Sequence, residues 1–344
     1  MSTFLGILVV TLAGLLMGSA LWPMKVMRRF EFEHWWFWGM SVGLVLIPWL
    51  VTLLFCPHAI SAYRTVDTSV VVKGNLLSLA WGIANVLCGL CFVRIGFALT
   101  GGILAGLGVS VGVILPMILK GSGLFSAAPS LGSLAGRTVL AGVGVMLVGV
   151  VFVSLAGFGR ERALKNFDKH SGGFGTGLTM AAISGVLSAG LGLSFVYSQG
   201  PIVAAMKAGG AADIPANFAV WAVGLLGGAF VNISYPVYLM TKNRSWNILV
   251  ESWREAALAA LIGLNFCGAV ALMGKGMLLL GALGASVGFG IQQSMQMLGN
   301  QGVGFLSGEW RAVHGVPRKQ MFIAIVILLA AAILMAYGKT LVKA

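Results

Sequence analysis

The dominant pattern along the chain is a series of ten apolar stretches, each about long enough to cross a lipid bilayer as a helix. A spanning helix needs about 20 apolar residues, because each residue adds about 1.5 Å along the helix axis. The pattern predicts helices at roughly 3–22, 35–56, 70–93, 95–119, 137–158, 174–200, 217–241, 254–281, 285–308 and 317–338. We therefore expect an all-α polytopic membrane protein.

Lys and Arg residues divide the loops into two sets that alternate along the chain. Loops and helix ends after the odd-numbered helices carry fourteen of the 22 basic residues, and the other set carries eight. Basic loops of membrane proteins stay on the cytoplasmic side. The richer set is therefore expected in the cytoplasm, and both chain termini are expected in the periplasm.

The most basic loop, residues 159–173, divides the chain into residues 1–158 and residues 174–344, with five predicted helices in each part. A five-helix unit repeated in tandem inserts its second copy upside down, because five is an odd number. Inverted repeats of this kind build secondary transporters, which bind their substrate near the membrane midplane between the two halves. We therefore predict two inverted five-helix repeats joined by a cytoplasmic connector.

Composition argues against several other classes of protein. Hydrophobic residues make up 58% of the chain, charged residues 9%, and the mean hydropathy is +0.97, whereas soluble domains carry about 25% charged residues. The lipid bilayer must therefore be the main solvent. The net charge of +13 is spread in small groups between apolar spans, whereas nucleic-acid-binding proteins gather basic residues on one polar face. No nucleic-acid partner is expected.

The sequence contains no recognisable arrangement of catalytic groups. No pair of carboxylates lies within a span, no metal-ligating cluster is visible, and all nine Asp and Glu residues fall in loops or at helix ends. Cys88 and Cys91 form a CxxC inside an apolar span, without a second pair or a nearby His, and are expected to pack as small apolar residues. We expect neither an enzyme nor a cofactor or metal site, and no proton-carrying group stands out within the membrane.

Polar side chains inside the predicted spans indicate a shared cavity near the midplane. Trp81 and Asn85 lie four residues apart, and therefore on one face of the third helix. Further neutral polar residues occupy the sixth to ninth helices: Ser188, Tyr197, Asn232, Asn265 and Gln292. Amides offer donors and acceptors, and an aromatic ring can stack on a sugar, so this set suits a polyhydroxylated ligand. Alternatively, each amide joins neighbouring helices, a contact worth roughly 0.6–2 kcal/mol.

Lys275 lies about 20 residues into the eighth predicted helix, roughly 30 Å from the helix start near Arg254. Its ammonium group can extend to water at the outer membrane face, as long basic side chains do near helix ends. If the helix begins later or tilts, Lys275 faces the cavity, where it would favour an anionic substrate. The sequence leaves both alternatives open.

Five short motifs are similar, in their order and spacing, to motifs of one transporter family. They are Trp22–Pro23–Met24–Lys25, Trp81–Gly82–Ile83–Ala84–Asn85, Leu187–Ser188–Ala189–Gly190, Gly227–Gly228–Ala229–Phe230–Val231–Asn232 and Gly308–Glu309–Trp310. Over nearly its whole length the chain resembles the L-rhamnose–proton symporters, a branch of the drug/metabolite transporter superfamily.

The resemblance implies ten helices in two inverted repeats, a place in the bacterial inner membrane, and inward transport of a small sugar coupled to protons by alternating access. The expected sugar is L-rhamnose. The chain departs from the family in the eighth helix, where an aromatic-rich stretch is replaced by Leu272–Met273–Gly274–Lys275–Gly276–Met277. A carrier of an anionic sugar or another small metabolite, bound through Lys275, is therefore an alternative. A non-transporting membrane sensor or complex subunit is a further alternative.

Overall fold

A computed structural model describes residues 2–95, 97–163 and 174–341, and every regular element within these ranges is a helix. The first part of the chain forms the following helices: α1 (Ser2–Ser19), η1 (Trp22–Val26), α2 (Phe32–Met40), η2 (Ser41–Leu46), α3 (Ile47–Phe55), α4 (Ala59–Thr65), α5 (Thr68–Ile95), α6 (Phe97–Leu119), η3 (Gly123–Ala127) and α7 (Leu134–Ala163). The second part forms α8 (Phe174–Ser188), α9 (Gly190–Ala208), α10 (Asp213–Gly224), α11 (Leu226–Asn243), α12 (Ile248–Glu251), α13 (Trp253–Leu280), η5 (Gly281–Leu283), η6 (Gly284–Gly288), α14 (Phe289–Leu306) and α15 (Val316–Thr340).

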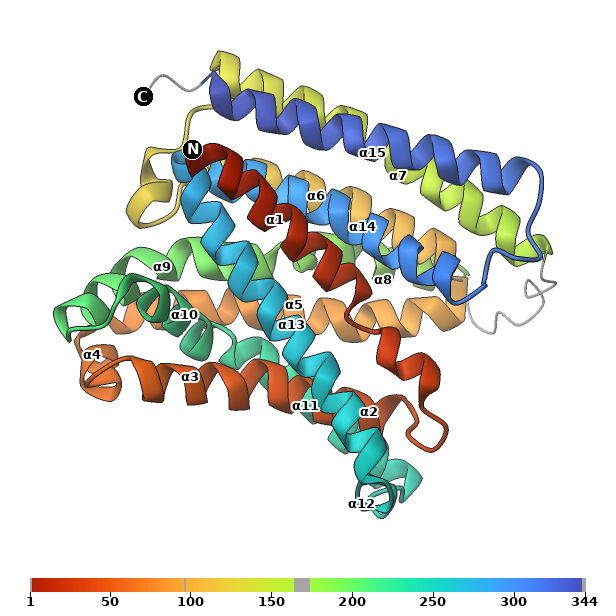
Figure 1. Ribbon diagram of the computed structural model, residues 1–344, viewed down its shortest axis with the longest axis horizontal. Helices are drawn as coiled ribbons and strands as arrows, with labels where there is room; N and C mark the ends of the chain where they lie inside the picture. Colours follow the sequence, from red (N-terminus) through yellow and green to blue (C-terminus); the bar gives the residue numbers. More distant parts are fainter. Residues whose placement is uncertain (1, 96, 164–173, 342–344) are drawn as a thin grey trace.

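The helices make this a multi-pass membrane protein. Within the described residues, seven helical segments are long and apolar enough to cross a membrane, and an eighth is added if the bent pair α10 and α11 forms one span. The longest of these segments, Trp253–Leu306, contains both α13 and α14. The chain turns between these two helices, at Gly281, where φ is +71°, and α14 then runs back towards the other end of the bundle (Figure 1).

Several helices are broken near the centre of the molecule. Helix α8 ends at Ser188 and α9 begins at Gly190, while α10 and α11 meet at Leu225 with a bend of 49°. Helix α2 continues into α3 through the π-helical turn η2, next to Pro48. Interruptions of this kind free backbone polar groups inside the membrane, which neighbouring helices or a water-filled cavity must satisfy.

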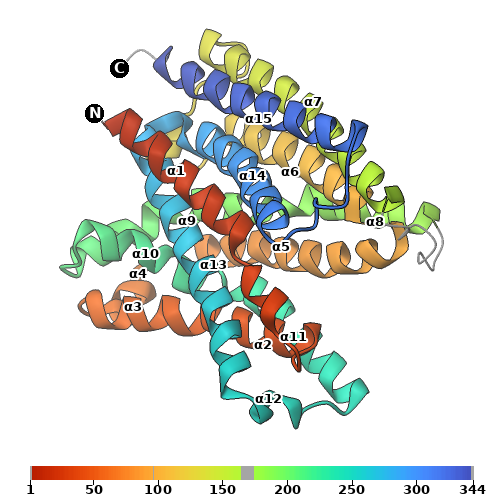
Figure 2. The same ribbon diagram turned by 45° about the vertical axis from the view of Figure 1, so that its right-hand side comes forward.

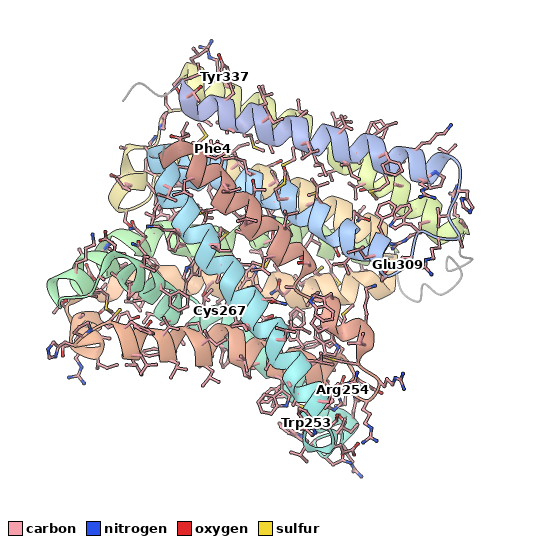
Figure 3. All side chains as sticks on the ribbon, viewed as in Figure 1. Phe4, Trp253, Arg254, Cys267, Glu309 and Tyr337 are labelled. Carbon is pink, nitrogen blue, oxygen red and sulfur yellow. The ribbon has the colours of Figure 1, made fainter. Side chains whose placement is uncertain are left out.

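The arrangement of the helices places both chain termini at one end of the molecule, which we call the terminal end (Figure 1). Helices α7 and α15 form an antiparallel pair along one side, and α1 lies across α13 and α14 (Figures 1 and 2). Arg254 and Glu309 lie away from Phe4 and Tyr337, at the opposite end (Figure 3). We call this opposite end the basic end, because its loops and helix ends carry Lys25, Arg254 and Arg311.

Close packing in the interior depends on glycine where two helices meet. Gly228 on α11 lies against the ring of Trp81 on α5, and a Cβ atom added there would come within 2.7 Å of the ring. Large apolar side chains cover the outer surface instead: Leu54 on α3 is 66% exposed and Ile333 on α15 is 70% exposed. A surface of this kind is stable against lipid and not against water, in agreement with the predicted bilayer environment.

Candidate functional site

The bundle encloses a cavity of about 320 Å³ among α1, α2, α5, α6, α8, α9, α13 and α14. This volume falls in the range of about 300–1,000 Å³ that is typical of small-molecule sites. Four of the residues predicted from the sequence line the cavity: Trp81, Asn85, Ser188 and Gln292. Residues that come from helices far apart in the sequence therefore meet in one place, as the shared-cavity hypothesis requires.

One wall of the cavity is aromatic. Trp81 stacks on Phe266 of α13, with ring centroids 5.6 Å apart and planes inclined by 24°. Trp36 of α2 and Phe289 of α14 also line the space. Flat apolar surfaces of this size can cover the C–H face or the methyl group of a sugar.

A second wall consists of amide side chains on α14. Gln292, Gln296 and Asn300 line the cavity at intervals of four residues, and therefore on one face of the helix. Gln293 lines the cavity beside them. The Nε2 atom of Gln292 donates to Oε1 of Gln296 over 3.1 Å, but Oε1 of Gln292 is buried and has no hydrogen-bond partner. A buried acceptor without a partner is costly, and a ligand hydroxyl in the cavity could satisfy it.

Asn232 lies behind the cavity wall and connects two of its side chains. Its Oδ1 atom accepts hydrogen bonds from Nε1 of Trp36 and from Nδ2 of Asn85, each over 3.2 Å. Its Nδ2 atom donates to the carbonyl oxygen of Gly228 over 2.9 Å. Asn232 is fully buried and is not among the residues that line the cavity. Its side chain therefore fixes the positions of Trp36 and Asn85 from behind.

The remaining predicted site residues lie elsewhere. Tyr197, Asn265 and Lys275 are partly buried and are not among the lining residues. Lys275 interacts electrostatically with Asp213, the first residue of α10. Ser188 lines the cavity at the last residue of α8, and its hydroxyl donates to the carbonyl oxygen of Gly185 over 2.7 Å.

The described residues that line the cavity include no Asp, Glu, Lys, Arg or His. A fixed charge in the ligand would therefore have no direct partner in this wall, and burying an unpaired charge is strongly unfavourable. The lining favours a neutral ligand that combines hydroxyl groups with apolar surface.

The cavity extends towards the basic end. Helix α14 runs to that end, and its last lining residue, Asn300, is exposed. Beyond it, the Glu309 carboxylate forms ion pairs with Lys25 and, over 2.8 Å, with Arg160. Burial raises the pKa of Glu309, but the hydrogen bond from Lys25 and the charge of Arg160 outweigh it and hold this pKa below its usual range.

Towards the terminal end the space is closed along α9. Leu191 lines the cavity, and one turn further along Phe195 stacks on Trp221 with centroids 4.7 Å apart. Beyond this pair, the Ser122 hydroxyl accepts from the backbone N–H of Gly200 and donates to the carbonyl of Val196. These contacts pack α9 against its neighbours between the cavity and the terminal end.

Sequence reasoning did not select Trp36, Phe266, Phe289, Gln296 or Asn300 as site residues. The aromatic residues carry no distinguishing signal, because Trp and Phe are common in lipid-facing and buried positions alike. The three amides of α14 do carry one: Gln292, Gln296 and Asn300 recur every four residues, a spacing that marks one helix face.

Comparison with known proteins finds one transporter family and several proteins of the same name. The family described as L-rhamnose-proton symport protein (RhaT) matches residues 2–340. An L-rhamnose-proton symporter of Cronobacter sakazakii is 26% identical over 323 residues, which cover 92% of each chain. Proteins of the same name from Yersinia pestis and Yersinia pseudotuberculosis are 30% identical over 213 residues, or 62% of this chain and 60% of theirs.

Proposed function

Because the chain belongs to the L-rhamnose-proton symport protein family, we propose that it is a secondary active transporter that carries L-rhamnose together with protons by alternating access. The observation that carries this proposal is the neutral cavity, with an aromatic wall on one side and amides on the other. L-Rhamnose is an uncharged 6-deoxy sugar, so it has both hydroxyl groups for amides and a methyl group for an apolar wall.

We assign the sugar contacts by chemistry and position. Trp81 and Phe266 offer the stacking surface, Asn85 and Gln292 offer amide groups, and Ser188 offers a hydroxyl at the break between α8 and α9. Asn232 acts as a positioning residue through Trp36 and Asn85. Tyr197 and Asn265 would reach the sugar only in a different conformation.

We further propose that ten helices cross the bacterial inner membrane as two inverted five-helix repeats. The number ten counts α10 and α11 as one span, α13 and α14 as two, and includes α6, whose apolar part Ile103–Leu119 is short. The excess of basic residues supports a cytoplasmic position for the basic end and a periplasmic position for both termini. In that orientation the cavity of this structure is open towards the cytoplasm.

The two alternatives from the sequence receive less support. An anionic cargo needs a cation in the site, whereas Lys275 is not among the cavity-lining residues and interacts with Asp213. A sensor or complex subunit without transport activity does not require a cavity that reaches one end of the bundle. L-Rhamnose symport is therefore the function that the site supports best.

Uptake of radiolabelled sugar into proteoliposomes tests this proposal. An inwardly directed proton gradient should drive accumulation of L-rhamnose, while unlabelled L-rhamnose should compete and sugar acids should not. A thermal-shift measurement gives independent evidence, since a ligand at about a hundredfold excess over its Kd stabilises the folded state by about 2.7 kcal/mol. Stabilisation by sugar acids alone, or no uptake of any sugar, would contradict the proposal.

A further inference from the structure

We propose that Glu33 binds the coupling proton, and that its protonation is communicated to the sugar cavity through α2 and α11. The inference rests on the proposed function, because only a proton-coupled transporter needs such a group. L-Rhamnose does not ionise near neutral pH, and the described cavity lining contains no carboxylate, ammonium, guanidinium or imidazole group. The proton must therefore be carried by a side chain outside the lining.

The described residues contain three buried acid or imidazole side chains: Glu33, His34 and Glu255. Buried ionisable groups in membrane proteins often mark proton or ion pathways. The hydrogen bonds of these three side chains differ, and the differences distinguish a group that can exchange a proton from groups that hold the structure together.

Glu255 is held by backbone donors. Its two oxygens accept from the N–H groups of Arg28, Arg29 and Phe30 over 2.6–3.1 Å. These bonds attach the loop before α2 to the first turn of α13. Protonation would weaken this attachment without affecting any side chain of the cavity, so Glu255 is assigned a structural role.

His34 also has both of its polar atoms engaged. Its Nδ1 atom accepts from the backbone N–H of Glu31 over 3.1 Å, and its Nε2 atom lies 3.0 Å from the carbonyl oxygen of Ser245. Because a carbonyl only accepts, the proton of the neutral ring belongs on Nε2. A second proton on Nδ1 would displace the Glu31 N–H and break the cap of α2, so His34 is a poor proton carrier.

Glu33 differs because both of its side-chain donors reach the same oxygen. Nδ2 of Asn243 and Oγ of Ser245 donate to Oε1, over 2.9 Å and 3.3 Å. A proton can therefore bind at Oε2 without displacing either donor. Burial of the side chain, which is 4% exposed, favours the neutral form, and the two hydrogen bonds favour the charged form. A helix movement that breaks these bonds shifts the balance towards proton uptake.

The elements that hold Glu33 are the elements that hold the cavity wall. Glu33 lies one turn before Trp36 on α2, and Asn243 lies on α11 with Asn232, the acceptor of the Trp36 hydrogen bond. Sugar in the cavity and a proton on Glu33 therefore both act on the packing of α2 against α11. Two ligands that favour the same arrangement of one helix pair bind cooperatively.

Among the described residues, two ionisable groups interact with this carboxylate. His34 on α2 and Tyr235 on α11 interact with it electrostatically. Lys242 and Arg244 flank its partner Asn243 in the sequence and are exposed.

In the proposed cycle, the proton enters from water on one side of the membrane and leaves to water on the other. When the cavity faces the outside, a proton from external water binds to Oε2 and forms the neutral acid. The α2–α11 pair then rearranges with sugar bound. When the cavity faces the basic end, Asn243 and Ser245 bind the carboxylate as in this structure, the Oε2–H bond breaks, and the proton passes to cytoplasmic water. One proton enters and one leaves for each cycle, and no oxidant or reductant is involved.

The test compares proton-driven accumulation with sugar exchange in proteoliposomes that contain the full chain. Glu33→Gln should reduce accumulation driven by a pH gradient by about tenfold or more, a loss within the usual range of coupling between two ligands. Counterflow of L-rhamnose at equal pH needs no net proton movement and should persist. Quenching of tryptophan fluorescence by L-rhamnose should depend on pH in the wild type and lose that dependence in Glu33→Gln.

Glu31→Gln is a matched control, because it removes an exposed negative charge two residues away on the same helix end. It should leave accumulation, counterflow and the pH dependence of fluorescence quenching unchanged. Glu33→Asp should restore part of the accumulation. Full accumulation by Glu33→Gln would overturn the proposal for Glu33 alone, as would loss of counterflow and binding together without rescue by Glu33→Asp. A wild-type protein that catalyses counterflow but no pH-driven accumulation would overturn the proposed symport itself.

Discussion

At the scale of single residues, the position of Asn232 decides how two cavity side chains are held. One buried oxygen accepts from both Trp36 and Asn85, so the indole and the amide are fixed relative to each other. Removing this acceptor leaves two donors without their partner, each at a cost of about 1–3 kcal/mol if it stays buried. We therefore expect the amide of Asn232 to contribute to sugar affinity without touching the sugar.

The first prediction concerns this acceptor. Asn232→Ala should weaken L-rhamnose binding by about tenfold or more, equivalent to about 1.4 kcal/mol, because Trp36 and Asn85 lose their common anchor. Isothermal titration calorimetry with the purified protein measures the change in the Kd for L-rhamnose. The abundance of the variant in the membrane should stay near that of the wild type. Wild-type affinity in Asn232→Ala would show that the network does not position the cavity wall.

The unpartnered oxygen of Gln292 leads to a second prediction, in which stability and affinity change in opposite directions. Gln292→Leu removes a buried unpaired acceptor, which costs about 1–3 kcal/mol, and gives up one hydrogen bond to Gln296, worth about 0.5–1.5 kcal/mol. The ligand-free variant should be as stable as the wild type or more stable in thermal unfolding, while its affinity for L-rhamnose falls. A destabilised variant with normal affinity would assign Gln292 a packing role.

At the scale of helices, the close approach of α11 to α5 sets the position of the stacking surface. The ring of Trp81 lies directly on Gly228, so any larger residue at that position pushes the ring towards the cavity. The same two helices are joined by the backbone N–H of Gly227, which donates to Oδ1 of Asn75 over 2.8 Å. The two glycines thus let a side-chain contact and a backbone contact form at one helix crossing.

A third prediction follows from this crossing. Gly228→Ala should strongly reduce L-rhamnose uptake, because the new Cβ atom would lie 2.7–2.9 Å from the Trp81 ring and from the carbonyl oxygen of Ser78. Gly89→Ala on α5 is the control, since a Cβ atom there meets nothing within 4 Å. Uptake by the two variants, normalised to the amount of protein in the membrane, separates a local steric effect from a general effect of alanine.

Part of the helical arrangement and of the candidate site could be predicted from the sequence. Within the described residues, the apolar stretches lie largely on helices, because length and hydropathy define a membrane-spanning helix. Seven or eight segments are long and apolar enough to span a membrane, and the number ten stays a prediction. The spacing of Trp81 and Asn85 on one helix face was sufficient to place both in the cavity. The role of Asn232 could not be predicted, because an amide that lines a cavity and one that supports its wall look the same in the sequence.

The burial of two glutamate side chains also could not be predicted from the sequence. Glu33 and Glu255 do lie at helix ends, as predicted, but both are buried, at 4% and 6% exposure. Their burial depends on partners more than two hundred residues away, such as Asn243 for Glu33 and the backbone at Arg28 for Glu255. Contacts between segments so distant in the chain leave no local pattern, so a candidate proton site could be recognised only in the structure.

At the scale of the whole molecule, the ion pairs of Glu309 connect three parts of the chain at the basic end. Lys25 follows α1, Arg160 lies near the end of α7, and Glu309 lies between α14 and α15. The guanidinium group of Arg160 also lies 5.5 Å above the ring of Trp310. Lys25 belongs to the first predicted repeat, Arg160 to the predicted connector and Glu309 to the second predicted repeat, so these bonds join the two halves at the end towards which the cavity extends.

The last prediction concerns the pH dependence of these ion pairs. The pKa of Glu309 is lower in the folded protein than in the unfolded chain, where it is about 4.3. The ion pairs therefore stabilise the folded state above that pH, and the stabilisation disappears as the pH falls through the lower folded pKa. Because the side chain is 35% exposed, solvent screening limits the total to about 1 kcal/mol or less.

Glu309→Gln should accordingly lower the melting temperature slightly at pH 7, and the difference from the wild type should vanish once the pH has fallen through the lowered folded pKa of Glu309. Asp67→Asn is a suitable comparison. The pKa of Asp67 is also lowered, by hydrogen bonds from Ser69 in the first turn of α5, two residues further along the chain, and these bonds join no distant segments. Of these two variants, only Glu309→Gln should therefore also change the rate of L-rhamnose counterflow, because Glu309, unlike Asp67, links the two predicted halves. Equal counterflow in both variants would restrict the Glu309 ion pairs to stability alone.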